Sequence, residues 1–281
     1  MKTILVVANQ TIGGARLFET IKRKVEEAGG DARVVICVPR TNPQHGNVIY
    51  DDAVIEAAQV RVDLARTYLR EAGIEAIGEV GDPDPYTAAM DAILEFQPDE
   101  IVVSTLPATS SGWLRRDLVE RITDASGLPM EHVVVDMAAE GLPFKVTLVV
   151  ANRTASSDTL LEHLRKRTEG DEGRRLHIVV IPLEGGGGAA AAQARARKAQ
   201  LLDRLRSSGM LAAGVTGDPD PYTATMNALQ FFRVDDIVIS TLPATRSGWL
   251  RADLIARVSN ASNKPVDHIA VEAPTKASAA A

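Results

Sequence analysis

Two loops rich in hydroxyl and amide side chains each occur twice in this chain of 281 residues. The first loop covers residues 8–11 (ANQT) and has its counterpart at 151–154 (ANRT). The second loop covers residues 104–112 (STLPATSSG) and has its counterpart at 240–248 (STLPATRSG). The second loop leads into a segment of helical period, where free backbone N–H groups and the positive end of a helix dipole attract negative charge. These residue types predict a site for an anion.

The candidate anion-binding residues lie in or beside these loops, except for Val38 at the end of the second predicted strand. In the first half they are Ala8, Asn9, Thr11, Val38, Ser104, Thr105, Ser110, Ser111, Gly112 and Arg115. In the second half they are Ala151, Asn152, Arg153, Thr154, Ser240, Thr241, Arg246, Ser247, Gly248 and Arg251.

The arginines distinguish the two copies. Arg115 and Arg251 are predicted in the first turn of the helix that follows the second loop. Arg153 and Arg246 occur in the second copy alone. Since arginine pairs well with phosphate and carboxylate, the second copy is the better candidate for binding an anion.

A structural alternative is open for the same loops. In this alternative Ser110, Ser111 and Ser247 are ordinary helix N-caps. Trp113 and Trp249 are then packing residues. The first and second helices of the two halves have drifted far apart while these loops stay nearly identical, which favours a site.

The loops belong to a repeat that covers the whole chain. The segment GDPDPYTAAM at 81–90 recurs with one change at 217–226, an offset of 136 that the second loop shares. The first loop has an offset of 143, so the halves differ by seven residues. We place the difference where Gly185–Gly188 replaces a longer loop, Arg40–Tyr50. So long a period indicates two whole domains rather than the units of a solenoid.

Each half alternates apolar runs with segments of helical period. The strands predicted from these runs are Ile4–Ala8, Arg33–Val38, Ile74–Val80, Glu100–Val103 and His132–Val135, and then Val146–Ala151, His177–Ile181, Leu211–Thr216, Asp236–Ile239 and Ile269–Val271. Helical faces are predicted from Leu17, Ile21 and Val25, from Ile55, Val62 and Leu69, and from Leu114, Leu118 and Ile122. This order predicts an α/β, Rossmann-like fold: two tandem, doubly wound, five-stranded and mostly parallel sheets with helices on both faces.

The predicted domains cover residues 1–137 and 145–273, with a linker at 138–144 and a disordered tail at 274–281. The formal charge of −6 argues against a nucleic-acid partner, and no apolar run is long enough to span a membrane. The apolar run at the start of the chain is too short for a secretory signal. The single cysteine, Cys37, permits no internal disulfide and predicts a cytoplasmic protein.

Other chemistries find less support in the sequence. Asp82 and Asp84 could bind a metal, but beside proline at a helix start they are better read as caps. The four glycines at 185–188 lack the Lys and Ser/Thr of a phosphate-binding loop. Neither a Ser-His-Asp order nor Cys/His metal spacing is found, so we expect no enzyme beyond weak ATP hydrolysis.

The order of elements, the segment GDPDPYTAAM, and a strand DEIVVS followed by a loop, a helix and the strand HVVVD resemble the universal stress protein family. The resemblance covers essentially the whole chain as a tandem pair of domains. It implies a stress regulator with ATP or AMP at the switch point of each sheet, and pairing through the last strand.

The chain departs from the glycine motif of the family's nucleotide-binding members. The motif positions fall on Ser104, Pro107, Asp117 and Leu118, and in the second half on Ser240, Pro243, Asp253 and Leu254. Glycine lets the backbone approach phosphates, whereas proline removes a donor and aspartate repels them. We therefore expect a nucleotide in a non-standard pose or a smaller anion; the alternative is a scaffold that binds no nucleotide.

The chain itself is the other predicted partner. If the last strands, His132–Val135 and His268–Val271, lie at sheet edges, they offer apolar pairing surfaces. We expect them to pair with each other or in a homodimer.

Overall fold

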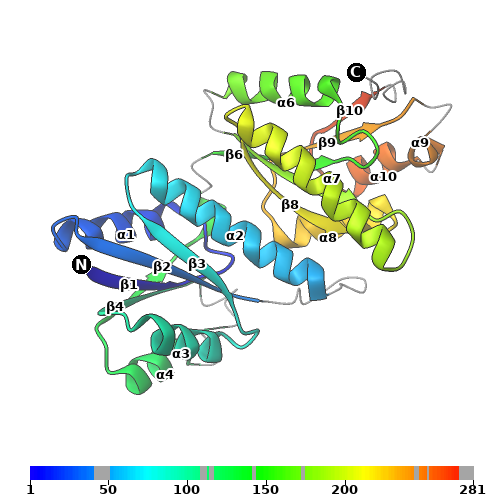
Figure 1. Ribbon diagram of the computed structural model, residues 1–281. Helices are drawn as coiled ribbons and strands as arrows, with labels where there is room; N and C mark the ends of the chain where they lie inside the picture. Colours follow the sequence, from blue (N-terminus) through cyan, green and yellow to red (C-terminus); the bar gives the residue numbers. More distant parts are fainter. Residues whose placement is uncertain are drawn as a thin grey trace. The chain divides into compact units, whose positions relative to one another are not determined.

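The structure is a computed structural model that describes residues 1–40, 51–107, 113, 117–140, 144–171, 175–243, 247–251 and 253–271 (Figure 1). The side chains of residues 51, 52, 138, 250 and 251 are outside this description. The chain divides into two compact units, and the division falls between Pro143 and Phe144.

The first unit alternates strands and helices. Its elements are β1 (Lys2–Val7), α1 (Ala15–Glu27), β2 (Ala32–Pro39), α2 (Asp51–Glu71), β3 (Ala76–Gly81), α3 (Pro85–Phe96), β4 (Glu100–Thr105), α4 (Leu118–Ser126), β5 (Met130–Val134) and α5 (Met137–Glu140). The five strands are all parallel, in the order β3-β2-β1-β4-β5.

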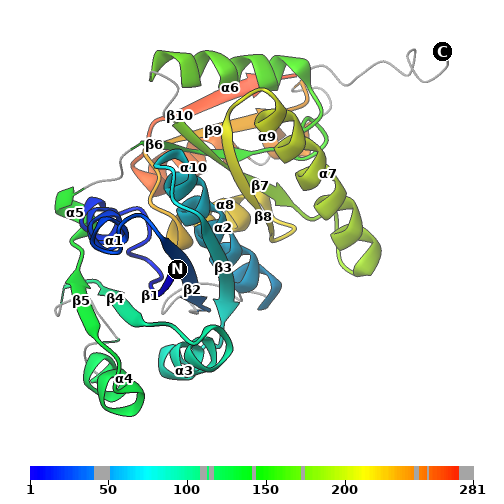
Figure 2. The same ribbon diagram turned by 60° about the vertical axis from the view of Figure 1, so that its left-hand side comes forward.

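The second unit repeats this alternation, with two helices between its last two strands. Its elements are β6 (Lys145–Val150), α6 (Asp158–Gly170), β7 (Arg175–Pro182), α7 (Gly188–Ser207), β8 (Leu211–Gly217), α8 (Pro221–Phe231), β9 (Asp236–Thr241), α9 (Gly248–Arg251), α10 (Leu254–Ser262) and β10 (Val266–Ala270). The sheet order is β10-β9-β6-β7-β8, again all parallel, and Figure 2 shows the strands in this sequence. The predicted doubly wound fold is confirmed in both units.

Alternate residues of the central strands supply two cores in the first unit. Ile4 and Val6 of β1 join the core with α1 and α2, whereas Leu5 and Val7 join the core with α3 and α4. Figure 1 shows α2 on one face of this sheet and α3 and α4 on the other. Because both faces are covered, β1 is buried along almost its whole length, which explains its continuous apolar sequence.

The repeated GDPDP segment starts a helix in each unit. Asp84 is the N-cap of α3 and accepts a hydrogen bond from the backbone N–H of Thr87 at 3.1 Å; Asp220 does the same for α8 with Thr223 at 3.0 Å. The glycine before the turn is needed for close packing, since a Cβ on Gly81 would lie 2.6 Å from the Cβ of Ala88. These contacts support the cap interpretation of the aspartates.

The seven-residue difference lies between the second and third strands, as predicted. The ends of β2 and β7, Pro39 and Pro182, differ by 143 positions, and the ends of β3 and β8, Gly81 and Gly217, differ by 136. In the second unit a short turn leads from Pro182 into α7.

Several predicted boundaries are wrong. The last strands begin earlier than expected, at Met130 and Val266, so His132 and His268 lie in mid-strand. Ile55 is 39% exposed and does not share the buried face of α2 with Val62 and Leu69.

The predicted linker is partly helical. Residues 137–140 form α5, and Glu140 accepts a hydrogen bond from the backbone N–H of Arg16 at 3.1 Å, within the first unit. The predicted tail, 274–281, lies outside the described residues.

Candidate functional site

A pocket lies at the carboxyl ends of β6 and β9 in the second unit. Its volume is about 250 Å³. The residues that line it are Asn152, Arg153, Thr154, Glu184, Ser240, Thr241, Leu242, Ser247, Gly248 and Trp249. The chain leaves β6 toward β7 on one side, while β9 lies on the other, so the pocket is at the switch point of the sheet.

Hydrogen bonds tie the first loop of the pocket to the second loop and to the end of β7. Thr154 donates its hydroxyl to the carbonyl oxygen of Ser240 at 3.1 Å, and the Asn152 amide donates to that of Pro182 at 2.9 Å. The first unit repeats both contacts, from Thr11 to Ser104 and from Asn9 to Pro39. The repeated Asn and Thr residues thus have a structural role that their position in the loops does not reveal.

One carboxylate sits between two arginines at the pocket. Glu184 accepts from Nε of Arg153 at 2.5 Å and from Nη2 of Arg197 at 3.2 Å. Burial opposes the charge of Glu184, but hydrogen bonds from the two arginines outweigh it, so the pKa of this carboxyl lies below its ordinary range. Arg153 is 66% exposed, and its ion pair uses Nε, which leaves the forked Nη pair outside that contact.

Ser240 supplies a buried hydroxyl. The residue is 1% exposed, and its Oγ has no hydrogen-bond partner among the described residues. In the first unit Ser104 is likewise 1% exposed, and its Oγ has no hydrogen-bond partner among the described residues. Since buried hydroxyls are ordinarily hydrogen-bonded, the Ser240 hydroxyl can serve a ligand in the pocket.

Thr241 is already engaged by the protein. Its hydroxyl donates to the carbonyl oxygen of Leu242 at 2.8 Å and lies 2.9 Å from Nε2 of His268. Thr105 and His132 form the equivalent pair at 2.8 Å, and burial lowers the pKa of His132. These threonines join the fourth strand of each sheet to the fifth.

The structure places the predicted residues of the second half in three groups. Seven line the pocket: Asn152, Arg153, Thr154, Ser240, Thr241, Ser247 and Gly248. Ala151 is fully buried in the core with α6 and α7, so its side chain is not part of the pocket. Arg246 and the side chain of Arg251 lie outside the described residues.

In the first half the structure describes fewer of the predicted site residues. Ala8 and Val38 are fully buried in the core with α1 and α2 rather than in a site. Asn9, Thr11, Ser104 and Thr105 lie together at the carboxyl ends of β1 and β4. Ser110, Ser111, Gly112 and Arg115 lie outside the described residues.

The helix expected after the second loop is interrupted in the second unit. The structure describes α9 over Gly248–Arg251, and α10 begins after Asp253 with its φ at +53°. Because the left-handed Asp253 breaks the helix, the dipole at the start of α9 is smaller than that of a helix continuous with α10. Asp117 has the same left-handed conformation, φ +49°, before α4.

Sequence reasoning missed four residues of the site. Glu184, Leu242 and Trp249 line the pocket, and Arg197 contacts Glu184 from α7. Trp249 was predicted as a packing residue. Glu184 had a usable signal, because an acidic residue just beyond the second strand is typical of dinucleotide-binding folds.

No family model matches the chain, and no curated protein shows significant similarity to it. Among solved structures, a universal stress protein in complex with cAMP has 17% identity and a TM-score of 0.33, covering 47% of this chain and 96% of its own. A universal stress protein from Archaeoglobus fulgidus DSM 4304 has 15% identity and a TM-score of 0.36, covering 96% of both chains. At such scores neither structure says what this chain binds, and the fold rests on its own strand order and register.

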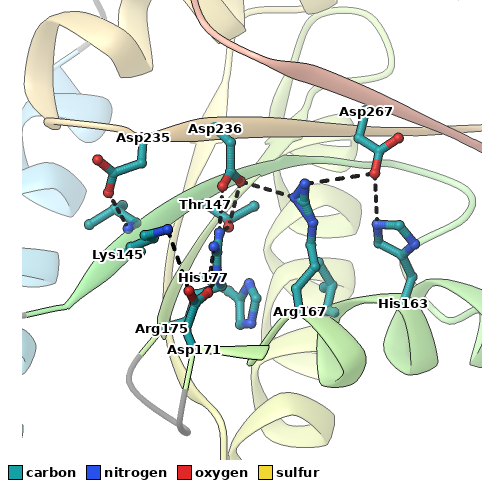
Figure 3. Close-up of polar contacts among 12 residues, drawn as sticks. Lys145, Thr147, His163, Arg167, Asp171, Arg175, His177, Asp235, Asp236 and Asp267 are labelled. Carbon is teal, nitrogen blue, oxygen red and sulfur yellow. Dashed lines mark hydrogen bonds and ion pairs between the residues drawn. The ribbon is translucent and has the colours of Figure 1, made fainter. Parts of the chain in front are cut away.

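A second polar cluster lies at the opposite, amino-terminal edge of the same sheet (Figure 3). Arg175 of β7 pairs with Asp236 of β9 at 2.5 Å, and Arg167 of α6 reaches Asp236 at 3.3 Å. Thr147 donates to the same carboxylate at 2.7 Å. Because the strand ends are tied to each other and to α6, this cluster is structural.

Among the residues that the structure describes, no group of three or more His, Cys, Asp and Glu side chains could hold a metal ion. No helix within the described ranges combines the length and apolar character needed to cross a membrane.

Proposed function

We propose that the second unit binds a small anion in the pocket at the ends of β6 and β9, and that the physiological ligand is a nucleotide such as AMP. The observation that carries the proposal is the buried Ser240 hydroxyl, without a partner among the described residues, in a pocket that Arg153 also lines. A hydroxyl donor and a guanidinium are the groups that recognise phosphate.

The size and shape of the pocket favour a monophosphate over ATP. A volume of about 250 Å³ is below the usual range for sites that enclose a drug-sized molecule. Pro243 and Asp253 stand where the resemblance to nucleotide-binding universal stress proteins places glycines, so the backbone lacks that cradle for a triphosphate. Leu242 and Trp249 supply an apolar wall suited to a base.

The proposed role is that of a cytoplasmic, universal stress protein-like regulator without fast catalysis. The only cysteine, Cys37, is buried, and burial raises the pKa of its thiol, which suits a residue of the core rather than a nucleophile. We expect phosphate release from ATP to stay near the uncatalysed rate; sustained turnover would contradict this role.

Isothermal titration of the whole chain with inorganic phosphate, AMP, ADP, ATP and cAMP tests the binding. We expect Arg153→Gln to weaken phosphate and AMP binding about tenfold, because it removes a charged hydrogen-bond donor. Arg165→Gln is the matched control, since Arg165 pairs with Glu162 and Glu169 on the exposed face of α6 and does not line the pocket. Absence of binding at millimolar ligand would contradict the proposal.

A second candidate function is a scaffold that associates through edge strands. β5 and β10 each lie at one edge of their sheet, with one hydrogen-bonded neighbour in it. The proposed pairing of these strands, with each other or in a homodimer, predicts that Val134→Asp shifts the mass measured by light scattering or lowers the unfolding temperature. If Val134→Asp changes neither, the pairing is wrong.

A further inference from the structure

Glu184 occupies a position that the proposed anion site does not by itself require. It lies two residues beyond the end of β7, the second strand of its unit, and its carboxylate lines the pocket. An acidic side chain in a site for an anion repels the ligand unless it contacts another part of it. The carboxylate of Glu184 therefore favours a ligand with hydrogen-bond donors in a part other than its anionic group.

The carboxylate of Glu184 is held in place and still has accepting capacity. Oε1 accepts from Arg153 and Oε2 from Arg197, so each oxygen uses one lone-pair direction on the protein. A carboxylate has about four such directions, which leaves one on each oxygen. Two acceptors at a fixed separation match two neighbouring hydroxyl groups.

Arg153 links this carboxylate to the anion-binding side of the pocket. Its Nε forms the ion pair with Glu184, and its two terminal nitrogens take no part in that ion pair. Ser240 adds its buried hydroxyl from β9, on the other side of β6 from β7. The pocket thus presents donors for a phosphate together with acceptors for hydroxyls.

We infer that Glu184 selects ligands that carry a vicinal diol beside the phosphate, as the ribose of a nucleoside monophosphate does. The inference rests on the proposed function of the pocket and adds the class of ligand. A hydroxyl donor opposite a charged acceptor forms one of the stronger neutral-to-charged hydrogen bonds, and a ligand without it leaves the carboxylate unsatisfied.

The test compares three probes on the whole chain: inorganic phosphate, AMP and 2′,3′-dideoxyadenosine monophosphate. The unaltered protein should bind AMP at least about tenfold more tightly than the dideoxy analogue. This comparison needs no variant, so it stands even if a substitution disturbs folding.

Glu184→Gln then assigns the preference to the carboxylate. We expect the variant to lose the preference for AMP over the dideoxy analogue, while its affinity for inorganic phosphate stays the same or rises. Glu162→Gln is the matched control, because it removes one negative charge from an exposed pair on α6, away from the pocket. Thermal unfolding of each variant checks that it folds.

Four results would overturn the inference. Equal binding of AMP and the dideoxy analogue by the unaltered protein would show that no diol is recognised, although the anion site would stand. A parallel loss of phosphate and AMP binding in Glu184→Gln would make Glu184 only a support for Arg153. A parallel gain would make it an internal competitor. Absence of binding by every probe would overturn the proposed function as well.

Discussion

Arg197 of α7 donates a hydrogen bond to the side-chain oxygen of Asn152 at the end of β6. The amide nitrogen of Asn152 donates in turn to the carbonyl oxygen of Pro182. One buried side chain therefore joins the ends of β6 and β7 to the helix that follows. By the offset of 136, Arg61 corresponds to Arg197 in the first unit, and burial lowers its pKa to about 10.

Asn152→Ala should lower the free energy of unfolding of the second unit by about 1–3 kcal/mol, because the buried Pro182 carbonyl and Arg197 both lose a partner. Urea unfolding of the whole chain measures this. Asn260→Ala, at an exposed position of α10, is the control and should change stability by less than about 0.5 kcal/mol. Equal stability of the two variants would contradict a structural role for Asn152.

Ser240 and Thr154 separate binding from stability. Ser240→Ala removes a hydroxyl that has no partner among the described residues, so the free energy of unfolding should change by less than about 0.5 kcal/mol, while phosphate affinity falls several-fold. Thr154→Val removes the donor to the Ser240 carbonyl and should cost about 1 kcal/mol of stability. Urea unfolding and phosphate titration of both variants check this, and a destabilised Ser240→Ala would show that its hydroxyl has a structural partner.

The fold could be predicted from the sequence because buried parallel strands are apolar along their whole length. In the edge strands β5 and β10 the apolar pattern is weaker. In β5, only Val133 of five residues is buried, so an apolar run marks little more than its end. For this reason the predicted strands lack the first residues of β5 and β10.

The site was only partly predictable. The repeated loops indicated Ser240, because both halves keep a serine there, and they indicated Arg153 as an arginine that the second copy alone carries. Arg197 could not be placed, since its contact with Glu184 depends on how α7 packs beside β7. The break at Asp253 was also hidden, because aspartate adopts a left-handed conformation without the usual glycine or proline signal.

The Arg175–Asp236 pair gives a prediction about stability. Both side chains are largely buried, 7% and 12% exposed, and Asp236 accepts hydrogen bonds from Arg175, Arg167 and Thr147 (Figure 3). Asp236→Asn should destabilise the second unit by about 1–3 kcal/mol, because Arg175 and Arg167 lose one charged acceptor while Arg175 keeps its pair with Asp171. Urea unfolding measures the loss, and Glu162→Gln, in an exposed pair, should have almost no effect.

His177 of β7 is buried in the same unit with a defined tautomer. Its Nε2 lies 2.8 Å from the Thr168 hydroxyl, which donates its own proton to the Leu164 carbonyl. Nε2 must therefore carry the imidazole proton, and Nδ1 has no partner among the described residues. Burial, followed by the charge of Arg175, lowers the pKa of His177 to about 3.

The lowered pKa of His177 predicts acid sensitivity well above the range in which carboxylates titrate. The unfolded chain binds a proton at His177 below pH 6.5, and the folded chain does so only near pH 3, so stability is complete above pH 6.5 and falls as the pH drops through this window. Between pH 7.5 and 5 the loss from this residue should reach about 2 kcal/mol. His177→Gln keeps a donor for Thr168 but cannot titrate, so urea unfolding at the two pH values should show a correspondingly smaller loss. Burial also lowers the pKa of His132, so this residue contributes to the pH dependence of stability in both proteins. If His177→Gln loses as much unfolding free energy between the two pH values as the unaltered protein, the acid sensitivity belongs to other groups.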